Sequence, residues 1–138
     1  MRNLPALLII CLLFLGCGKA ENVVPRVPVN VKIVKTDPRY TALNAPGGYA
    51  YISGAGVAGI IIYRQVDGSY VAYDRCSSYQ PEKLCAVTVD DTGFTATDPC
   101  SGSKFSLSDG SPVKAPATKY LRSYLVNTTQ FEIFVQTN

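Results

Sequence analysis

Cysteines and carboxylates carry the chemistry open to this 138-residue sequence, because it contains no histidine. Without imidazole, catalytic triads, His-liganded zinc or haem, and histidine proton shuttles are all excluded. Cysteine thiolates can instead form disulfides, attack electrophiles or bind soft metal ions. The cysteines that follow the N-terminal apolar run are Cys17, Cys76, Cys85 and Cys100.

Cys17 closes an N-terminal segment that is typical of exported proteins. Arg2 supplies one positive charge, and an apolar run follows from Leu4 to Leu15 that is too short to span a bilayer as a mature helix. Its end, Phe14-Leu15-Gly16-Cys17, resembles the lipobox of bacterial lipoproteins, although Phe14 stands where Leu is usual. We therefore expect cleavage before Cys17 and attachment of lipid to Cys17. The alternative is a plain secretory signal cut elsewhere, or an uncleaved anchor.

The remainder of the chain divides into a tether and one domain. Residues 17–28 contain two prolines and no apolar periodicity, which is typical of an extended linker. Residues 29–138 contain nine short β-like runs separated by turn residues, and no convincing helical periodicity. The runs are 29–34, 49–52, 59–64, 70–73, 86–89, 94–97, 104–107, 122–126 and 131–135. This pattern predicts an all-β fold, a small antiparallel sandwich or barrel.

Three separated segments of this domain, residues 71–78, 98–105 and 107–126, resemble in this order segments of the Rieske family. Residues 71–78 resemble the strand that runs into the family's Cys-x-His loop, and residues 98–105 resemble its Cys-Pro-x-His-Gly-Ser segment. Residues 107–126 resemble its Asp-Gly turn, its Gly-Pro-Ala loop and the strand that follows. The resemblance implies a small antiparallel β domain with two loops of the kind that hold a [2Fe-2S] cluster.

The ligand positions of the resemblance depart from the family pattern. A Rieske cluster is held by two thiolates and two imidazoles. The matching positions here are Cys76, Ser78, Asp98 and Ser101, so only one of the four ligands remains. Serine hydroxyls and a carboxylate are poor donors to an iron–sulfide core. We therefore expect a degenerate site with no cofactor and no metal.

The resemblance also implies a disulfide between Cys85 and Cys100. In several Rieske proteins such a bond joins the two cluster loops. Cys85 lies further along the chain than the matching cysteine of the family, which we interpret as the result of a short insertion over residues 80–83. An exported domain would meet oxidising conditions that favour the bond. The number and spacing of the cysteines do not by themselves fix the connectivity, so two other pairings stay open, Cys76 with Cys100 and Cys76 with Cys85.

Three functions are compatible with these residues. The first is a non-enzymatic binding or structural module, anchored through Cys17 to membrane lipid at the bacterial cell envelope, on the periplasmic or surface side, with a possible protein partner there. The second is the function that the resemblance implies, electron transfer by a ferredoxin-like oxidoreductase component. The third is thiol–disulfide exchange through Cys76, next to Arg75. A net charge of +3 without clustering argues against nucleic acid.

A glycine pattern at residues 54–59 has a structural interpretation. Gly54-Ala55-Gly56-Val57-Ala58-Gly59 has the spacing of a dinucleotide-binding loop, but β-like runs flank it and no helix follows. We expect a loop between two strands rather than a phosphate site.

Overall fold

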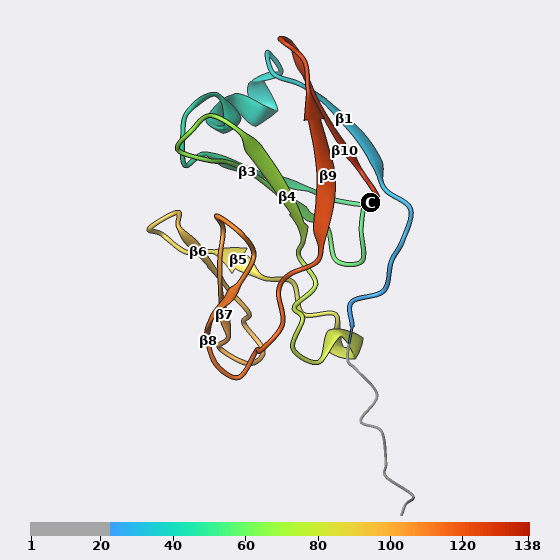
Figure 1. Ribbon diagram of the computed structural model, residues 1–138, viewed down its shortest axis with the longest axis vertical. Helices are drawn as coiled ribbons and strands as arrows, with labels where there is room; N and C mark the ends of the chain where they lie inside the picture. The colour runs from blue at the N-terminus through green and yellow to red at the C-terminus, as the bar shows by residue number, and fades with distance from the viewer. Residues whose placement is uncertain (1–22) are drawn as a thin grey trace, which may run out of the picture.

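The fold is built from two antiparallel sheets, seen in a computed structural model that describes residues 23–138 (Figure 1). The predicted signal peptide, Cys17 and the first part of the predicted tether lie outside the described residues. The large sheet has the strand order β1-β10-β9-β4-β3-β2, and the small sheet has the order β5-β6-β7-β8.

The strands are short, and two 3₁₀ helices interrupt them. In the large sheet the strands are β1 (Asn30–Val34), β2 (Tyr49–Ile52), β3 (Ile60–Arg64), β4 (Tyr70–Asp74), β9 (Ser123–Thr128) and β10 (Glu132–Gln136). In the small sheet they are β5 (Thr88–Val89), β6 (Thr95–Thr97), β7 (Lys104–Ser106) and β8 (Pro112–Lys114). The 3₁₀ helices are η2 (Pro38–Asn44) and η3 (Pro81–Lys83).

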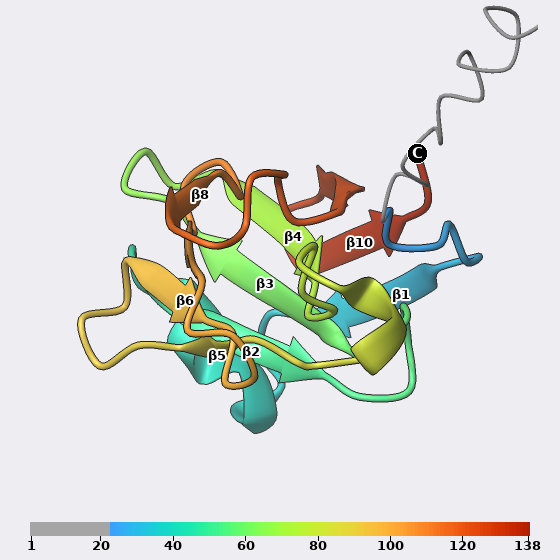
Figure 2. The ribbon, with the colours of Figure 1, turned by 90° about the horizontal axis from the view of Figure 1, so that it is seen from below.

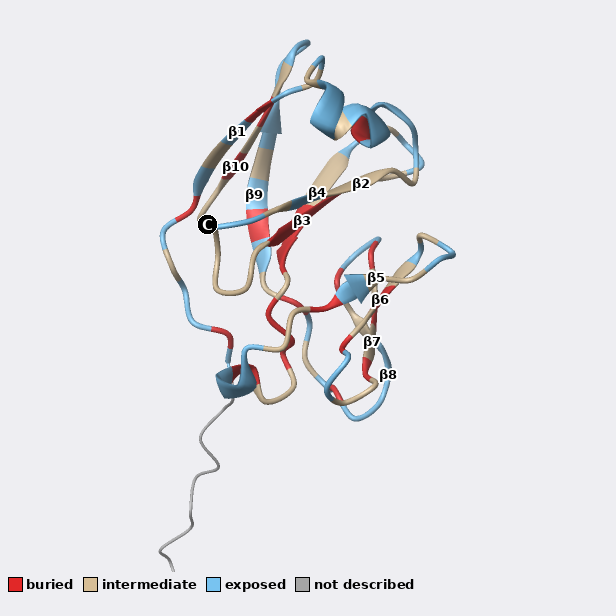
Figure 3. Ribbon diagram, turned by 180° about the vertical axis from the view of Figure 1, so that it is seen from behind, coloured by how far each residue is buried: buried red, intermediate tan, exposed pale blue. Residues whose placement is uncertain are grey.

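Strand β3 lies between two hydrophobic cores, which is why its three successive isoleucines are all buried (Figure 3). Ile60 and Ile62 belong to a core within the large sheet, together with residues of β1 and β10. Ile61 faces the other way and packs with Phe105 and other small-sheet residues. Side chains of a strand point alternately to opposite faces, so an uninterrupted apolar run fits a strand covered on both sides.

The small sheet is inserted into the large one between β4 and β9. These two strands are neighbours in the large sheet, and Asp74 N–H donates to the Arg122 carbonyl across them at 2.8 Å. The chain therefore leaves and re-enters the large sheet at nearly the same place. Loops at the end of β4 and around the small sheet are held together at one pole of the molecule, the lower pole in Figure 1.

The turn at Asp109-Gly110 shows how closely the sheets approach. Gly110 has φ +78°, and a Cβ there would lie 2.8 Å from the Tyr73 ring. Only glycine fits this combination of left-handed backbone and close ring contact. The turn predicted from the sequence is thus required by packing against β4.

The predicted antiparallel all-β fold is confirmed, and each of the nine predicted runs overlaps a strand. Strand β8 was not expected, because it begins with Pro112 and is only three residues long. The helices η2 and η3 were also not expected. Among residues 23–138, no helix is long and apolar enough to cross a membrane.

Candidate functional site

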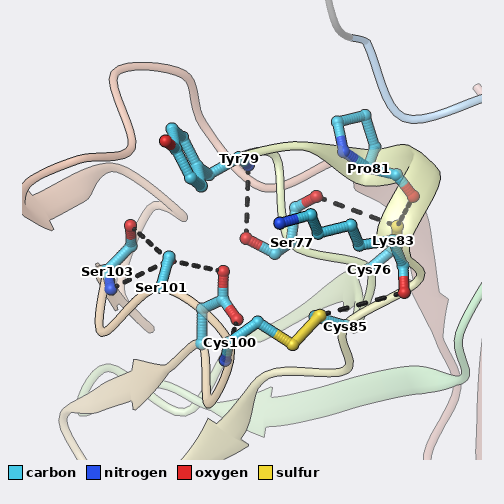
Figure 4. Close-up of a disulfide and its surroundings, with 10 residues drawn as sticks. Cys76, Ser77, Tyr79, Pro81, Lys83, Cys85, Cys100, Ser101 and Ser103 are labelled. Atoms are coloured by element: carbon cyan, nitrogen blue, oxygen red, sulfur yellow. Dashed lines mark hydrogen bonds between the residues drawn. A yellow bond between two sulfur atoms is a disulfide. The ribbon is translucent and has the colours of Figure 1, made fainter.

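Three loops converge at the lower pole and contain all the candidate site residues that the structure describes. The first loop (residues 75–87) follows β4, the second (residues 98–103) joins β6 to β7, and the third (residues 115–122) leads from β8 to β9. The candidates Cys76, Ser78 and Cys85 are in the first loop. The others, Asp98, Cys100 and Ser101, are in the second (Figure 4).

The Cys76 thiol is completely buried and is directed at its own loop. Its Sγ donates to the Pro81 carbonyl at 3.5 Å (Figure 4). Its backbone N–H donates to the Asp74 carboxylate at 2.8 Å. Burial, reinforced by the negative charges of Asp74, Asp98 and Glu82, raises the pKa of the Cys76 thiol to about 11. The group is therefore a neutral thiol at physiological pH.

A disulfide joins the first loop to the second. Cys85 and Cys100 are bonded, with their Cα atoms 6.2 Å apart, while Cys76 is the free cysteine among the described residues (Figure 4). Of the three pairings open to these residues, the structure forms the one that the resemblance implied. The bond fixes the separation of the two loops.

Asp98 is the first residue of the second loop and is buried, with 1% of its surface exposed. Its carboxylate accepts a hydrogen bond from the Cys100 backbone N–H at 2.8 Å and another from the Ser101 hydroxyl at 2.6 Å. Burial raises the pKa of Asp98, but hydrogen bonds from Ser101, Ser77 and the Cys100 amide outweigh it, so this pKa is below its usual value. The carboxylate is thus ionised and bound by donors of the loops themselves.

Serine hydroxyls connect the third loop to the other two. Ser103 Oγ lies 2.9 Å from Ser101 Oγ and accepts a hydrogen bond from the Ala117 N–H at 2.9 Å. From the first loop, the Ser78 hydroxyl donates to the Lys119 carbonyl at 2.6 Å. All three loops are therefore connected by bonds between protein atoms.

One group of potential metal-binding residues was found among residues 23–138. Cys85, Asp98 and Cys100 offer ligand atoms that lie within 4.8 Å of one another. The two sulfurs are bonded to each other in the disulfide, so neither is a thiolate that could bind a metal ion.

A cavity of about 360 Å³ lies between the three loops. Its lining is mainly polar and comprises Tyr79, Gln80, Lys83, Asp98, Cys100, Ser101 and Pro116. The Tyr79 backbone N–H donates to Ser77 Oγ at 3.2 Å, a bond within the part of the first loop that lines the cavity (Figure 4). The volume falls in the range of small-molecule sites.

Comparison with known proteins identifies the fold. No family model and no curated protein matches the sequence. Among solved structures, the plasma membrane Rieske protein PetC3 of the cyanobacterium Synechocystis PCC 6803 is similar with a TM-score of 0.57 and 18% identity, over 78% of this chain and 97% of that one. The fold is Rieske-like.

Two structures from carbazole 1,9a-dioxygenase systems agree with this Rieske-like fold. A chain in the complex of reduced oxygenase and oxidized ferredoxin has a TM-score of 0.54 and 21% identity, over 78% of this chain and 93% of its own length. The ferredoxin from Nocardioides aromaticivorans IC177 has a TM-score of 0.50 and 19% identity, over 81% and 99% respectively. Identities this low show the fold and leave the function to the residues of the site.

Asp74 is a central residue of this Rieske-like domain that the sequence pattern did not single out. Its buried carboxylate accepts hydrogen bonds from Val57 N–H at 2.6 Å, Ala58 N–H at 3.1 Å and the Tyr124 hydroxyl at 2.6 Å, besides the one from Cys76. Burial, together with the hydrogen bond to Asp74, raises the pKa of Tyr124. The feature of the sequence that could have pointed to Asp74 is its position, as a carboxylate directly after the apolar run 70–73.

The glycine pattern of residues 54–59 is explained by the same carboxylate. Gly56 has φ +70°, and a Cβ there would lie 2.5 Å from Asp74 Oδ2. Glycine is therefore needed for the loop to approach Asp74 closely. The loop lies between β2 and β3, as predicted, and two of its amides bind a protein carboxylate.

Proposed function

We propose that this protein is a lipoprotein of the bacterial cell envelope whose Rieske-like domain is a non-enzymatic binding or structural module without a [2Fe-2S] cluster. The observation that carries the proposal is the state of the four ligand positions. Cys76, Ser78, Asp98 and Ser101 each make hydrogen bonds within the three loops.

The donor set at these positions does not fit a Rieske cluster. Such a cluster needs two thiolates and two neutral imidazoles, and this chain has no histidine. Cys76 is the one free thiol among residues 23–138, and its pKa of about 11 leaves it protonated. The other positions offer two hydroxyls and a carboxylate, which are hard donors unsuited to a sulfide-bridged iron pair.

Bonds between protein atoms take over the role of holding the loops in place. The Cys85–Cys100 disulfide joins the first two loops, and the hydrogen bonds of Ser78 and Ser103 attach the third. The loops are thereby ordered around the polar cavity of about 360 Å³. A preformed cavity with a lysine, a tyrosine and a glutamine at its wall supports a binding role.

The two other functions have less support. Electron transfer is supported only by the similarity of the fold to a Rieske protein and to a dioxygenase ferredoxin. The donor set at the four ligand positions opposes this function. Thiol–disulfide exchange through Cys76 needs an accessible thiolate. The complete burial and the raised pKa of this thiol oppose that function as well.

Iron and sulfide analysis of the purified full-length protein tests the absence of a cluster. The protein is isolated anaerobically, then incubated with ferrous iron, sulfide and a thiol reductant, with a Rieske ferredoxin treated in parallel as the positive control. We expect no stoichiometric iron, no visible absorption band and no paramagnetic signal after reduction. A brown protein with two irons and two sulfides per chain would overturn the proposal.

Lipid attachment is tested separately by replacing Cys17. We expect the wild-type protein to sediment with membranes and to carry an acyl mass increment on Cys17, and the Cys17→Ala variant to lack both. A wild-type protein that is cleaved elsewhere, or that carries no acyl mass, would overturn the anchor while leaving the cluster result unaffected.

A further inference from the structure

We propose that the lower pole of the domain lies against the lipid headgroups, with Leu84 and Tyr120 inserted into the membrane interface. This inference rests on the lipid anchor proposed above. We call this surface the membrane-facing pole and define it by Val23, residues 80–84 of the first loop and residues 119–120 of the third loop.

The described chain begins at this pole and is fixed there. Val24 is buried, with 3% of its surface exposed, and its carbonyl accepts two hydrogen bonds from the Arg122 guanidinium, one of them at 2.8 Å from Nε. Val23 and Val24 line a cavity of about 260 Å³ together with Ser78 and Tyr120. The chain is therefore held against the first and third loops (Figures 1 and 2).

The distance from the anchor to this pole is limited by the sequence. Only residues 18–22 separate Cys17 from Val23. An extended chain covers at most about 3.5 Å per residue, so the link reaches at most roughly 20 Å. A compact domain of this size is roughly 35 Å across. Because the link is shorter than the domain, it favours orientations in which the pole at which it enters faces the bilayer.

The side chains at the membrane-facing pole suit a lipid interface. Leu84 is 59% exposed and Tyr120 is 61% exposed, and Val23 is also exposed. Exposed aliphatic side chains together with a tyrosine, which has an apolar ring and a polar hydroxyl, match the gradient from acyl chain to headgroup. The charged residues of this pole, Glu82, Lys83 and Lys119, sum to a net charge of only +1, so we expect contact mainly through apolar burial rather than through attraction to anionic lipid.

The backbone at Leu84 points to the same conclusion. Leu84 has φ +53°, in the left-handed region that non-glycine residues rarely adopt. Its N–H donates to the Pro81 carbonyl at 3.0 Å, and the next residue, Cys85, is fixed by the disulfide. The turn therefore holds a large apolar side chain outward, where it has no core to join. Unfavourable backbone conformations of this kind are concentrated at functional surfaces.

Exposure alone does not select this pole, because the opposite end also presents an apolar side chain. Phe131, in the β9–β10 turn at the top of Figure 1, is 60% exposed. It differs from Tyr120 in its distance from the point at which the chain enters the domain. Phe131 is consequently a matched control for an experiment on orientation.

The test uses single tryptophans, because the chain has none of its own. Full-length lipidated Leu84→Trp, Tyr120→Trp and Phe131→Trp variants are reconstituted into phosphatidylcholine vesicles with and without brominated acyl chains. We expect at least a two-fold loss of fluorescence and a blue shift for the first two variants, and unchanged emission for Phe131→Trp. Raising the salt concentration should leave these differences in place.

The outcomes separate this inference from the anchor on which it rests. Equal quenching of the three variants on a protein with acylated Cys17 would overturn the orientation and leave the anchor intact. Absence of an acyl mass on Cys17 would overturn the anchor and the orientation together. Amide hydrogen exchange of the unsubstituted protein gives a second measurement, in which residues 80–85 and 118–121 should be protected on vesicles relative to detergent.

Discussion

Cys76 illustrates how burial changes the chemistry of a single residue. The sequence places this thiol next to Arg75 and near a disulfide, an arrangement that would suit exchange. In the structure its Sγ faces the Pro81 carbonyl, and its burial, together with the neighbouring carboxylates, raises its pKa instead of lowering it. The position is predictable from sequence, while the reactivity depends on burial and on charges that become neighbours only after folding.

We expect Cys76 to resist alkylation in the native protein. A pKa of about 11 in place of 9.0 lowers the thiolate fraction at pH 8 by roughly 100-fold, and burial slows access further. Mass spectrometry of iodoacetamide labelling should show a rate at least 100-fold below that of the same chain in denaturant without reductant. A native rate within a few-fold of the denatured rate would restore the thiol-exchange hypothesis.

Asp98 should make stability depend on acidic pH. Its pKa in the folded protein is below the ordinary value of 3.8, so its ionised form is stabilised by folding. This contribution is present above about pH 4 and is lost as the pH falls through the folded pKa. The difference in free energy of unfolding between wild type and Asp98→Asn should therefore be largest near neutral pH and shrink on acidification.

Urea unfolding of the two proteins across this pH range measures the effect. Ser101→Ala provides a matched control, because it removes one donor to Asp98 and leaves the carboxylate in place. It should reduce the pH dependence without abolishing it. A difference between wild type and Asp98→Asn that grows as the pH falls would mean that Asp98 is not stabilised as a carboxylate.

At the scale of elements, Asp74 connects three parts of the chain. Its carboxylate at the end of β4 accepts hydrogen bonds from the 54–59 loop before β3 and from Tyr124 on β9. These partners lie 16 to 50 residues away in sequence, so no local pattern could reveal them. Most strands, in contrast, are predictable from the local alternation of apolar and polar residues, as in Asn30–Val34. Strand β8 was not predicted, because it begins with a proline, which is unusual in strands except at sheet edges.

Replacing Asp74 should destabilise the protein more than removing one of its partners. Asp74→Asn places a donor amide against backbone donors, and we expect a loss of about 3 kcal/mol in the free energy of unfolding. Tyr124→Phe removes one hydroxyl and should cost about 1 kcal/mol. Equilibrium urea denaturation compares the two variants. Equal losses would show that the backbone amides of the 54–59 loop contribute little to this connection.

The whole molecule should respond to reductant and be indifferent to chelator. The Cys85–Cys100 bond closes a loop with a sequence separation of 15, which is worth about 3 kcal/mol in the chain-entropy model. Reduction should lower Tm by about 10 °C. A metal chelator should leave Tm unchanged, because the loops are held by protein atoms.

Thermal unfolding followed by circular dichroism measures both effects. The Cys85→Ala/Cys100→Ala double variant is the matched control, and reductant should not lower its Tm further. A fall in Tm caused by chelator alone would reveal a metal ion and contradict the proposed function.

The insertion of the small sheet between β4 and β9 sets the order in which the molecule can fold. Strands β5 to β8 pair with their sequence neighbours, whereas β1 pairs with β10, so that Asn30 meets Gln136. Contacts between distant residues carry the larger loop-closure entropy and form later. We therefore expect the hairpins that carry the second loop to form early and to shorten the path between β4 and β9, and the N-terminal strand β1 to dock last.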